Sequence, residues 1–277
     1  MRFQLANITA VLTGAASGIG AALAPRLAAK GAHLALVDRD AAGLARVAAA
    51  AGVKGRITTH EIDVADAAAM PALAAAVQAA HGNAGLVIGN AGVALVGTFE
   101  QASLADFEWL MNINFWGAVR LVHAFLPQLR AAPAGQIALT SSIFGLIAPP
   151  GQAAYAAAKF ALRGFGESLR HELSGTDIGV TLIHPGGIDT NIARGARIGS
   201  GVDPAAAKAG LALFQKLLRT SPDVAAAKII AAIEQRRPRL LIGGDAYRVD
   251  VIQRLAPARY WRLIAPRDAG LTDLTKS

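Results

Sequence analysis

A tyrosine and a lysine lie four positions apart in the segment YAAAK, which starts at Tyr155 and ends at Lys159. At this spacing both side chains lie on one face of a helix. A lysine cation beside a phenol favours the ionised phenol and lowers its pKa from the usual value of about 10. Tyr155 is therefore a candidate general acid or base near neutral pH. The pair alone is a weak signal, because most chance matches are surface pairs.

Two further polar residues precede this pair in the sequence. Ser142 lies thirteen positions before Tyr155, at the end of an apolar run over residues 137–141, where its hydroxyl can hydrogen-bond a substrate oxygen. Asn114 lies inside a long predicted helix.

A glycine-rich turn follows the first apolar run. The segment TGAASGIG spans residues 13–20 and places Gly14, Gly18 and Gly20 between a predicted strand and a predicted helix. Glycines at such a turn let the backbone approach a pyrophosphate, and the helix N-terminus offers free N–H groups to it. In a chain with 29 glycines this segment could be an ordinary turn. Its position directly after the first strand favours a dinucleotide site.

The second predicted strand ends at Asp38. A carboxylate there can accept both hydroxyls of an adenosine ribose and would repel a 2′-phosphate, so we expect NAD in preference to NADP. Two alternatives stay open: the neighbouring Arg39 could meet a 2′-phosphate, and Asp38 could be only a helix cap.

Short apolar runs alternate with alanine-rich helical stretches along the chain. The predicted strands are residues 8–13, 33–37, 57–63, 86–90, 137–141, 180–184 and 240–242, and the predicted helices are 18–30, 41–51, 67–79, 104–129, 155–173 and 222–235. This order predicts βαβ units, and strands that are apolar throughout are typical of a sheet covered on both faces. The expected fold class is therefore α/β: a single-domain Rossmann fold with a doubly wound, seven-stranded parallel sheet and helices on both faces.

Two segments interrupt this rhythm. Residues 194–220 are a long insertion after the sixth strand and a candidate substrate lid within the catalytic domain, residues 1–245. Residues 246–277 form a basic tail; the window 236–267 holds eight arginines and two aspartates. We expect one or two short amphipathic helices broken near Pro257. They could touch a membrane surface, or pack on the body or on a neighbouring subunit.

The composition excludes several classes of protein. The 277 residues contain no cysteine, which excludes a disulfide scaffold, a zinc-thiolate site and a cysteine nucleophile, and fits a cytoplasmic protein. Despite a mean hydropathy of +0.40, we expect no signal peptide and no membrane-spanning helix. The net charge is +8, yet nucleic-acid binding is not expected, because no aromatic and basic surface is apparent outside the tail.

Together the motifs resemble those of the classical short-chain dehydrogenases/reductases over about residues 5–245. The match comprises the TGxxxGIG turn, Asp63-Val64, Asn90-Ala91-Gly92, the Asn114 segment, Ser142, the YxxxK pair and the segment PGGIDT at residues 185–190. One small departure is Gly89, where the family often has a second asparagine.

The resemblance implies hydride transfer between a nicotinamide cofactor and a secondary alcohol or ketone. Tyr155 would be the general acid/base, Ser142 would polarise the reacting oxygen, and Lys159 would bind the nicotinamide ribose and lower the Tyr155 pKa. Asn114 would hold a water that links Lys159 to solvent. The implied cofactor-binding residues are Gly14, Ser17, Gly18, Ile19, Gly20, Asp38, Arg39, Asp63, Val64, Asn90, Ala91, Gly92, Tyr155, Lys159, Pro185, Gly186, Ile188 and Thr190.

The substrate is expected to be lipophilic, because apolar residues surround the predicted site. They are Val93, Ala94 and Leu95, then Ile143, Phe144, Leu146 and Ile147, and in the lid Ile198, Leu211, Leu213 and Phe214, of which about half are expected to face the pocket and the rest to be core. Arg194 and Arg197 could hold an anionic substrate, although loop arginines are more often solvated.

Two other functions remain open. One is a 3-oxoacyl-carrier-protein reductase that docks an acidic carrier on the basic tail, although such reductases generally prefer NADPH. The other is a non-catalytic NAD(H)-binding regulator. The resemblance also implies a homodimer or homotetramer formed through the two long helices.

Overall fold

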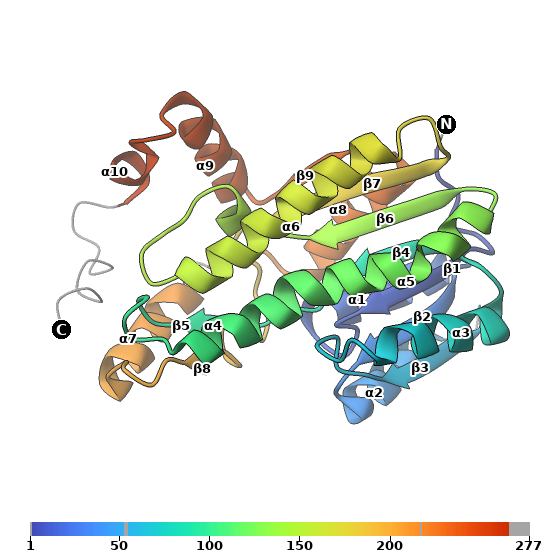
Figure 1. Cartoon of the computed structure of the whole chain (residues 1–277), viewed down its shortest axis with the longest axis horizontal. Coiled ribbons are helices and arrows are strands. Elements are labelled where there is room, and N and C mark those ends of the chain that lie inside the picture. Colours follow the sequence, from blue (N-terminus) through green and yellow to red (C-terminus); the bar gives the residue numbers. More distant parts are fainter. Residues whose placement is uncertain (1, 53–54, 217, 266–277) are drawn as a thin grey trace.

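The computed structural model describes residues 2–52, 55–216 and 218–265 (Figure 1). Seven parallel strands form one sheet in the order β3-β2-β1-β4-β6-β7-β9. Their bounds are β1 Thr9–Thr13, β2 His33–Asp38, β3 Ile57–Glu61, β4 Ala84–Gly89, β6 Gly135–Thr140, β7 Ile178–Pro185 and β9 Arg239–Ile242. This confirms the predicted α/β class with a seven-stranded parallel sheet.

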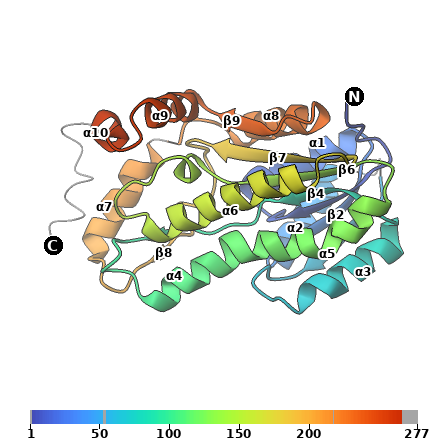
Figure 2. The ribbon, with the colours of Figure 1, turned by 45° about the horizontal axis from the view of Figure 1, so that its top comes forward.

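Helices cover both faces of the sheet (Figure 2). One layer consists of α1 (Gly18–Ala29), α2 (Ala41–Ala51) and α8 (Pro222–Glu234), and the other of α3 (Ala69–His81), α5 (Gly117–Ala131) and α6 (Ala153–Glu172). Every residue of β1, β4 and β6 is buried, which explains why these strands are apolar without alternation. The sequence pattern therefore reports burial on two faces.

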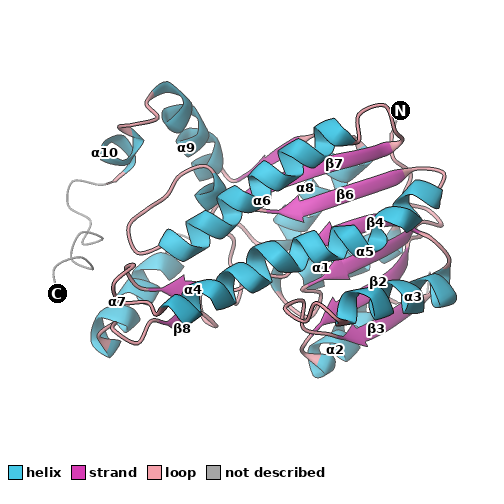
Figure 3. Ribbon diagram, in the orientation of Figure 1, coloured by secondary structure: helices cyan, strands magenta, loops and turns pink. Residues whose placement is uncertain are grey.

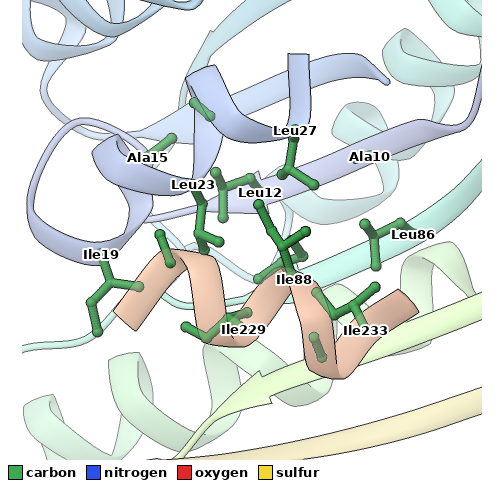
Figure 4. Close-up of a cluster of buried hydrophobic side chains, with 14 of the residues drawn as sticks. Ala10, Leu12, Ala15, Ile19, Leu23, Leu27, Leu86, Ile88, Ile229 and Ile233 are labelled. Carbon is green, nitrogen blue, oxygen red and sulfur yellow. The ribbon is translucent and has the colours of Figure 1, made fainter. Parts of the chain in front are cut away.

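The larger core lies between α1, α8 and the sheet (Figure 4). Leu12, Leu23 and Ile88 are fully buried there, and Ile229 from α8 packs into the same cluster. Burying each such side chain stabilises the fold by about 1.5–3 kcal/mol relative to leaving it exposed. This core holds α1, and with it the glycine turn, against the ends of the strands.

The predicted helix over residues 104–129 is not uniform. It consists of α4 (Leu104–Met111), a π-helical turn at Asn112–Trp116, and α5. Single π-helical turns inside α-helices are frequent at functional sites. The turn contains Asn114, one of the predicted catalytic residues.

The elements that the sequence pattern missed include two strands of two residues each and one helix. The predicted lid contains β8 (Arg197–Ile198) and α7 (Pro204–Gln215), and β8 pairs in parallel with β5 (Leu95–Val96). Strands of two residues carry no periodicity that could reveal them. Figure 3 shows α4, α7 and this small sheet at the end of the molecule toward which the strand arrows of the main sheet point.

The basic tail forms two short helices, as predicted. α9 (Gly244–Leu255) and α10 (Tyr260–Ile264) flank Pro257. The remainder of the predicted tail, residues 266–277, lies outside the described residues. Ala246 and Val249 are buried against the body, while other apolar side chains of these helices are exposed. Contact with a membrane stays a prediction, as does the oligomer. In the described part of the chain no helix is both long enough and apolar enough to cross a bilayer.

Two glycines of α6 allow a matched test of packing against the sheet. A Cβ on Gly166 would lie 2.6 Å from Leu182 Cδ2 on β7, whereas a Cβ on Gly164 would meet nothing within 4 Å. We expect Gly166→Ala to lower the free energy of unfolding by about 1–3 kcal/mol through overpacking. Gly164→Ala should raise it by up to about 1 kcal/mol through helix propensity. Urea unfolding of both variants measures this, and equal effects would contradict the packing described.

Candidate active site

The glycine turn after β1 has room for backbone only. A Cβ on Gly20 would overlap the carbonyl oxygen of Gly14, and a Cβ on Gly14 would lie 2.8 Å from Ala91 Cα. Gly14 and Gly18 also have positive φ angles, +66° and +52°. At the N-terminus of α1, Ser17 makes no side-chain cap hydrogen bond, so the first-turn N–H groups are open to an anion. The turn therefore fits a pyrophosphate.

Asp38 is oriented over this turn. Its Oδ2 accepts a hydrogen bond from the N–H of Ala16 at 3.0 Å, and its Oδ1 accepts one from the N–H of Asp40 at 3.1 Å. It is Asp40, not Asp38, whose side chain caps α2, through the N–H of Gly43. The arrangement leaves a negative charge where the resemblance puts the adenosine ribose. Arg39 is exposed beside it.

The ends of β1 and β4 are joined by side-chain hydrogen bonds. Thr13 Oγ1 accepts from the N–H groups of Asn90 and Ala91, and Asn90 Nδ2 donates to the carbonyls of Thr13 and Gly14. Asn90 thus holds the glycine turn in place.

Asp63 and Val64 follow β3. Asp63 Oδ1 accepts from the N–H of Ala65 at 2.9 Å, and Val64 is buried against Gly117 of α5. They lie just after the end of β3, which stops at Glu61 and not at residue 63 as predicted, and their contact with a cofactor stays a prediction.

Ser142, Tyr155 and Lys159 meet at the end of β6. The side chain of Ser142 is hydrogen-bonded with the Tyr155 hydroxyl, and its Oγ also accepts from the N–H of Phe144. Lys159 is 2% exposed, and its Nζ donates to the carbonyl of Thr140 at 3.0 Å and lies 5.6 Å from the centre of the Tyr155 ring. The structure thus brings the three predicted residues together.

Asn114 joins this group through the π-helical turn. Its Oδ1 accepts from the N–H of Val93 and its Nδ2 donates to the Val93 carbonyl, at 2.8 and 2.9 Å. A Cβ on Gly92 would lie 3.3 Å from Asn114 Oδ1 and 3.5 Å from Lys159 Nζ. Gly92 therefore leaves open the space that separates Asn114 from Lys159.

The expected lowering of the Tyr155 pKa is not found in this structure. Burial raises the pKa of Tyr155 to about 12, which outweighs the lowering by its hydrogen bond with Ser142. Burial also lowers the pKa of Lys159 to about 8. The ring of Tyr155 packs against apolar neighbours, with Phe144 at 90° and 6.1 Å between ring centres. Without another positive charge, desolvation dominates, and the phenol is protonated at neutral pH.

The segment after β7 faces the glycine turn. Thr190 packs against Gly18, since a Cβ on Gly18 would lie 3.1 Å from Thr190 Cγ2. Ile188 is buried and forms a bridge with Thr220, so the end of the candidate lid is fastened to this segment. Residues 185–190 therefore lie where a ligand on the glycine turn would extend.

The two arginines considered for an anionic substrate have other partners. Arg197 forms an ion pair with Asp106 at 2.9 Å and stacks on the Trp109 ring, 3.6 Å from its centre. Arg194 lies 3.6 Å from a carboxylate oxygen of Asp189. We therefore assign Arg197 to holding β8 on α4.

Three of the apolar residues expected around the pocket are buried, and the side chains of Leu213 and Phe214 lie outside the described part of the structure. Leu95, Leu146 and Ile147 are 3% exposed or less, whereas Ile143 and Phe144 are partly exposed. Phe144 contacts the ring of Tyr155. The immediate surroundings of the phenol are therefore apolar.

His184 is a site residue that sequence reasoning missed. It is fully buried on β7, and its Nδ1 is hydrogen-bonded to the carbonyl of Ser142 at 3.0 Å. Because a carbonyl only accepts, Nδ1 carries the proton, and Nε2 has no hydrogen-bond partner among the described residues. A lone histidine in an apolar strand carries no signal that its partner is the backbone of a catalytic serine.

A parallel sheet of this order, a glycine turn after β1 and a Ser–Tyr–Lys group after β6 define a dinucleotide-binding oxidoreductase. The comparisons agree with this class. A family model described as short chain dehydrogenase matches residues 8–200. SadH of Mycobacterium tuberculosis, which is named as an oxidoreductase, is 42% identical over 261 residues, 92% of this chain and 93% of that protein.

Two solved structures share the fold. A short-chain dehydrogenase/reductase from Burkholderia phymatum in complex with NAD has a TM-score of 0.84 and 29% identity, covering 96% of this chain and 99% of the other. A short-chain dehydrogenase from Mycobacterium paratuberculosis bound to NAD has a TM-score of 0.74 and 25% identity, covering 87% and 97%. The chain belongs to the short-chain dehydrogenase/reductase family.

The buried His184 predicts how stability depends on pH. Burial, together with Arg239 and Arg163, lowers its pKa from 6.5 to about 4. Between pH 6.5 and about 4 the unfolded chain binds a proton at His184, whereas the folded chain does not. The free energy of unfolding therefore falls as the pH falls. Between pH 7.5 and 5 this contribution is about 2 kcal/mol.

His184→Asn keeps an N–H donor for Ser142 but does not titrate. Its stability should fall less steeply over this pH range than that of the unmodified protein, by about 2 kcal/mol, in urea unfolding at the two pH values. The other histidines and carboxylates are common to both proteins and cancel. Parallel pH profiles would contradict this account of His184.

Proposed function

We propose that this protein is an NAD-dependent oxidoreductase that interconverts a lipophilic secondary alcohol and its ketone, with Tyr155 as general acid/base. The observation that carries the proposal is the meeting of Ser142, Tyr155 and a buried Lys159 beside a glycine turn shaped for a pyrophosphate. The NAD bound by the two solved relatives supports the choice of cofactor.

The chain's own residues divide the work on the cofactor. The glycine turn and the open N-terminus of α1 would hold the pyrophosphate, and Asp38 the adenosine ribose. Lys159 would bind the nicotinamide ribose, and Ile188 and Thr190 the carboxamide. When bound, the nicotinamide supplies the hydride acceptor or donor.

Tyr155 moves the proton of the reaction. In alcohol oxidation the phenolate takes the substrate's hydroxyl proton while the carbinol carbon loses its hydride, and in ketone reduction the phenol returns that proton to the oxygen. Ser142 hydrogen-bonds the same oxygen. The Lys159 cation favours the phenolate electrostatically. The raised pKa of Tyr155 in the free protein suits the acid role directly, whereas the base role requires deprotonation first.

The substrate class follows from the surroundings of the phenol. Phe144 packs edge-on against Tyr155, and Arg197 is engaged by Asp106 and Trp109. An apolar approach without a free anion clamp at Arg197 favours an uncharged, lipophilic alcohol or ketone.

The test is absorbance-followed reduction of NAD with secondary alcohols from small to steroid-sized. We expect turnover that Tyr155→Phe lowers at least about a hundredfold, the usual contribution of general acid–base catalysis, while NADH binding is retained. Because the phenol must lose its proton to act as a base, oxidation should accelerate from pH 7 to 9, whereas ketone reduction should not. NADH binding without turnover on any substrate would favour the non-catalytic regulator, and a Tyr155→Phe variant of full activity would exclude the mechanism.

The choice of NAD over NADP depends on the charge of Asp38. Asp38→Asn keeps the size of the side chain but removes the repulsion of a 2′-phosphate. We expect the ratio of kcat/KM for NADP to that for NAD to rise about tenfold or more, corresponding to about 1.4 kcal/mol. Asp40→Asn is the matched control, because it removes a neighbouring charge and asparagine can still cap α2. Equal shifts in the two variants would show that Asp38 does not face the ribose.

A further inference from the structure

A carboxylate of the C-terminal helix α9 contacts the segment after β7. Asp245 lies in the first turn of α9, and its Oδ2 accepts a hydrogen bond from the backbone N–H of Gly187 at 2.8 Å. Gly187 belongs to residues 185–190, which would hold the nicotinamide end of the cofactor. Asp245 directly precedes the basic tail, and the basic composition of this region does not predict a carboxylate contact with residues 185–190.

Two glycines make room for this carboxylate. A Cβ on Gly186, at the end of β7, or on Gly243, at the end of β9, would overlap the carboxyl group of Asp245. Gly243 also has a φ of +100°, which side chains rarely adopt. The carboxylate therefore fills a slot whose walls are backbone from two strand ends.

The position of Asp245 is fixed by the packing of α9. Asp250, on the same helix, accepts two hydrogen bonds from the guanidinium of Arg239 on β9, and Arg254 contacts the same carboxylate at 3.2 Å. Ala246 and Val249 are buried beneath the helix. α9 is thus anchored to the sheet independently of its contact with Gly187.

Backbone hydrogen bonds from β9 and from the end of the candidate lid also hold residues 186–187. The Gly186 N–H donates to the carbonyl of Ile242 at 2.8 Å, and the Gly187 carbonyl accepts from Thr220 and Arg219, at the end of the candidate lid. The N–H of Gly187 is the group that Asp245 satisfies. Without that carboxylate the N–H must turn to water, and the segment loses its link to α9.

We propose that Asp245 is a positioning residue for the nicotinamide half of the cofactor. Its carboxylate fixes Gly187, and through it residues 185–190, in the conformation that binds the nicotinamide. The inference rests on the proposed function, because it needs a nicotinamide to be positioned. The proposal concerns affinity for the nicotinamide half of the cofactor alone. Loss of Asp245 should therefore weaken the binding of NADH but not of a ligand without nicotinamide, whereas general damage to the fold would weaken both.

The experiment compares two ligands that share the adenosine and pyrophosphate groups. NADH carries the nicotinamide and ADP-ribose lacks it, and both are titrated into the full-length protein by fluorescence or calorimetry. In Asp245→Ala we expect the Kd of NADH to rise about tenfold to a hundredfold, as for loss of one hydrogen bond to a charged acceptor. The Kd of ADP-ribose should stay within about twofold. Asp245→Asn, which keeps an oxygen acceptor, should recover most of the NADH affinity.

Two further variants guard the interpretation. Asp245→Ser is too short to reach Gly187 but suits a helix N-terminus, so it repeats the test if the alanine variant folds poorly. Tyr260→Phe is the matched control on α10. It removes the hydroxyl that accepts a hydrogen bond from the N–H of Ala148 at 3.0 Å, in the loop after Ser142. Ala148 is exposed, so water can replace this bond, and NADH affinity should not change.

The outcomes separate the two proposals. An alanine variant that binds NADH normally, or that weakens NADH and ADP-ribose equally, would overturn the role of Asp245 while leaving the proposed function intact. An asparagine variant no better than alanine would overturn it too. If the unmodified protein bound ADP-ribose but gained nothing from the nicotinamide of NADH, the proposed cofactor and this inference would both fail.

Discussion

The arrangement of the site depends on one buried cation. Lys159 is 2% exposed, and no carboxylate among the described residues forms an ion pair with it. Removing an ammonium from water costs several kcal/mol unless polar groups replace the solvent. The fold supplies the carbonyl of Thr140, and burial lowers the pKa of Lys159 to about 8. Such a cation is poorly explained by stability, but a ribose and a phenolate beside it would complete its surroundings.

The surrounding structure fixes the position of the Lys159 cation relative to the Tyr155 phenol. Ser141 Oγ donates to the carbonyl of Lys159 at 2.9 Å and so fastens α6 to the end of β6. A Cβ on Gly145 would overlap Ser141 Oγ, so the turn after Ser142 must pass close to α6. On the other side of Ser142, His184 donates to its carbonyl. The ends of β6 and β7 and one helix, α6, therefore determine where the Ser142 hydroxyl meets Tyr155.

Sequence alone predicted what short-range patterns encode. Buried strands appear as apolar runs, and residues such as Gly14, Asp38 and Ser142 stand at strand ends, where parallel sheets gather their site residues. Partners far apart in the sequence could not be read in this way. His184 is 42 positions from Ser142 and Asp245 is 58 from Gly187, and neither pair has a local spacing rule. The pKa of Tyr155 in the free protein shows the same limit: the charge of Lys159 is visible in the sequence, whereas the burial that raises this pKa is a property of the packed structure.

Part of the positive charge in the arginine-rich window 236–267 has a structural role. Arg239 and Arg254 converge on Asp250, so part of the basic excess serves to attach α9 to the sheet. With α9 fixed, its first turn reaches the segment after β7 through Asp245, and α10 reaches the loop after Ser142 through Tyr260. The outer face is different: Val251, Leu255 and Leu263 are 54%, 81% and 58% exposed. The two C-terminal helices therefore contact both loops of the site with polar side chains on their inner face, while apolar side chains on their outer face are exposed.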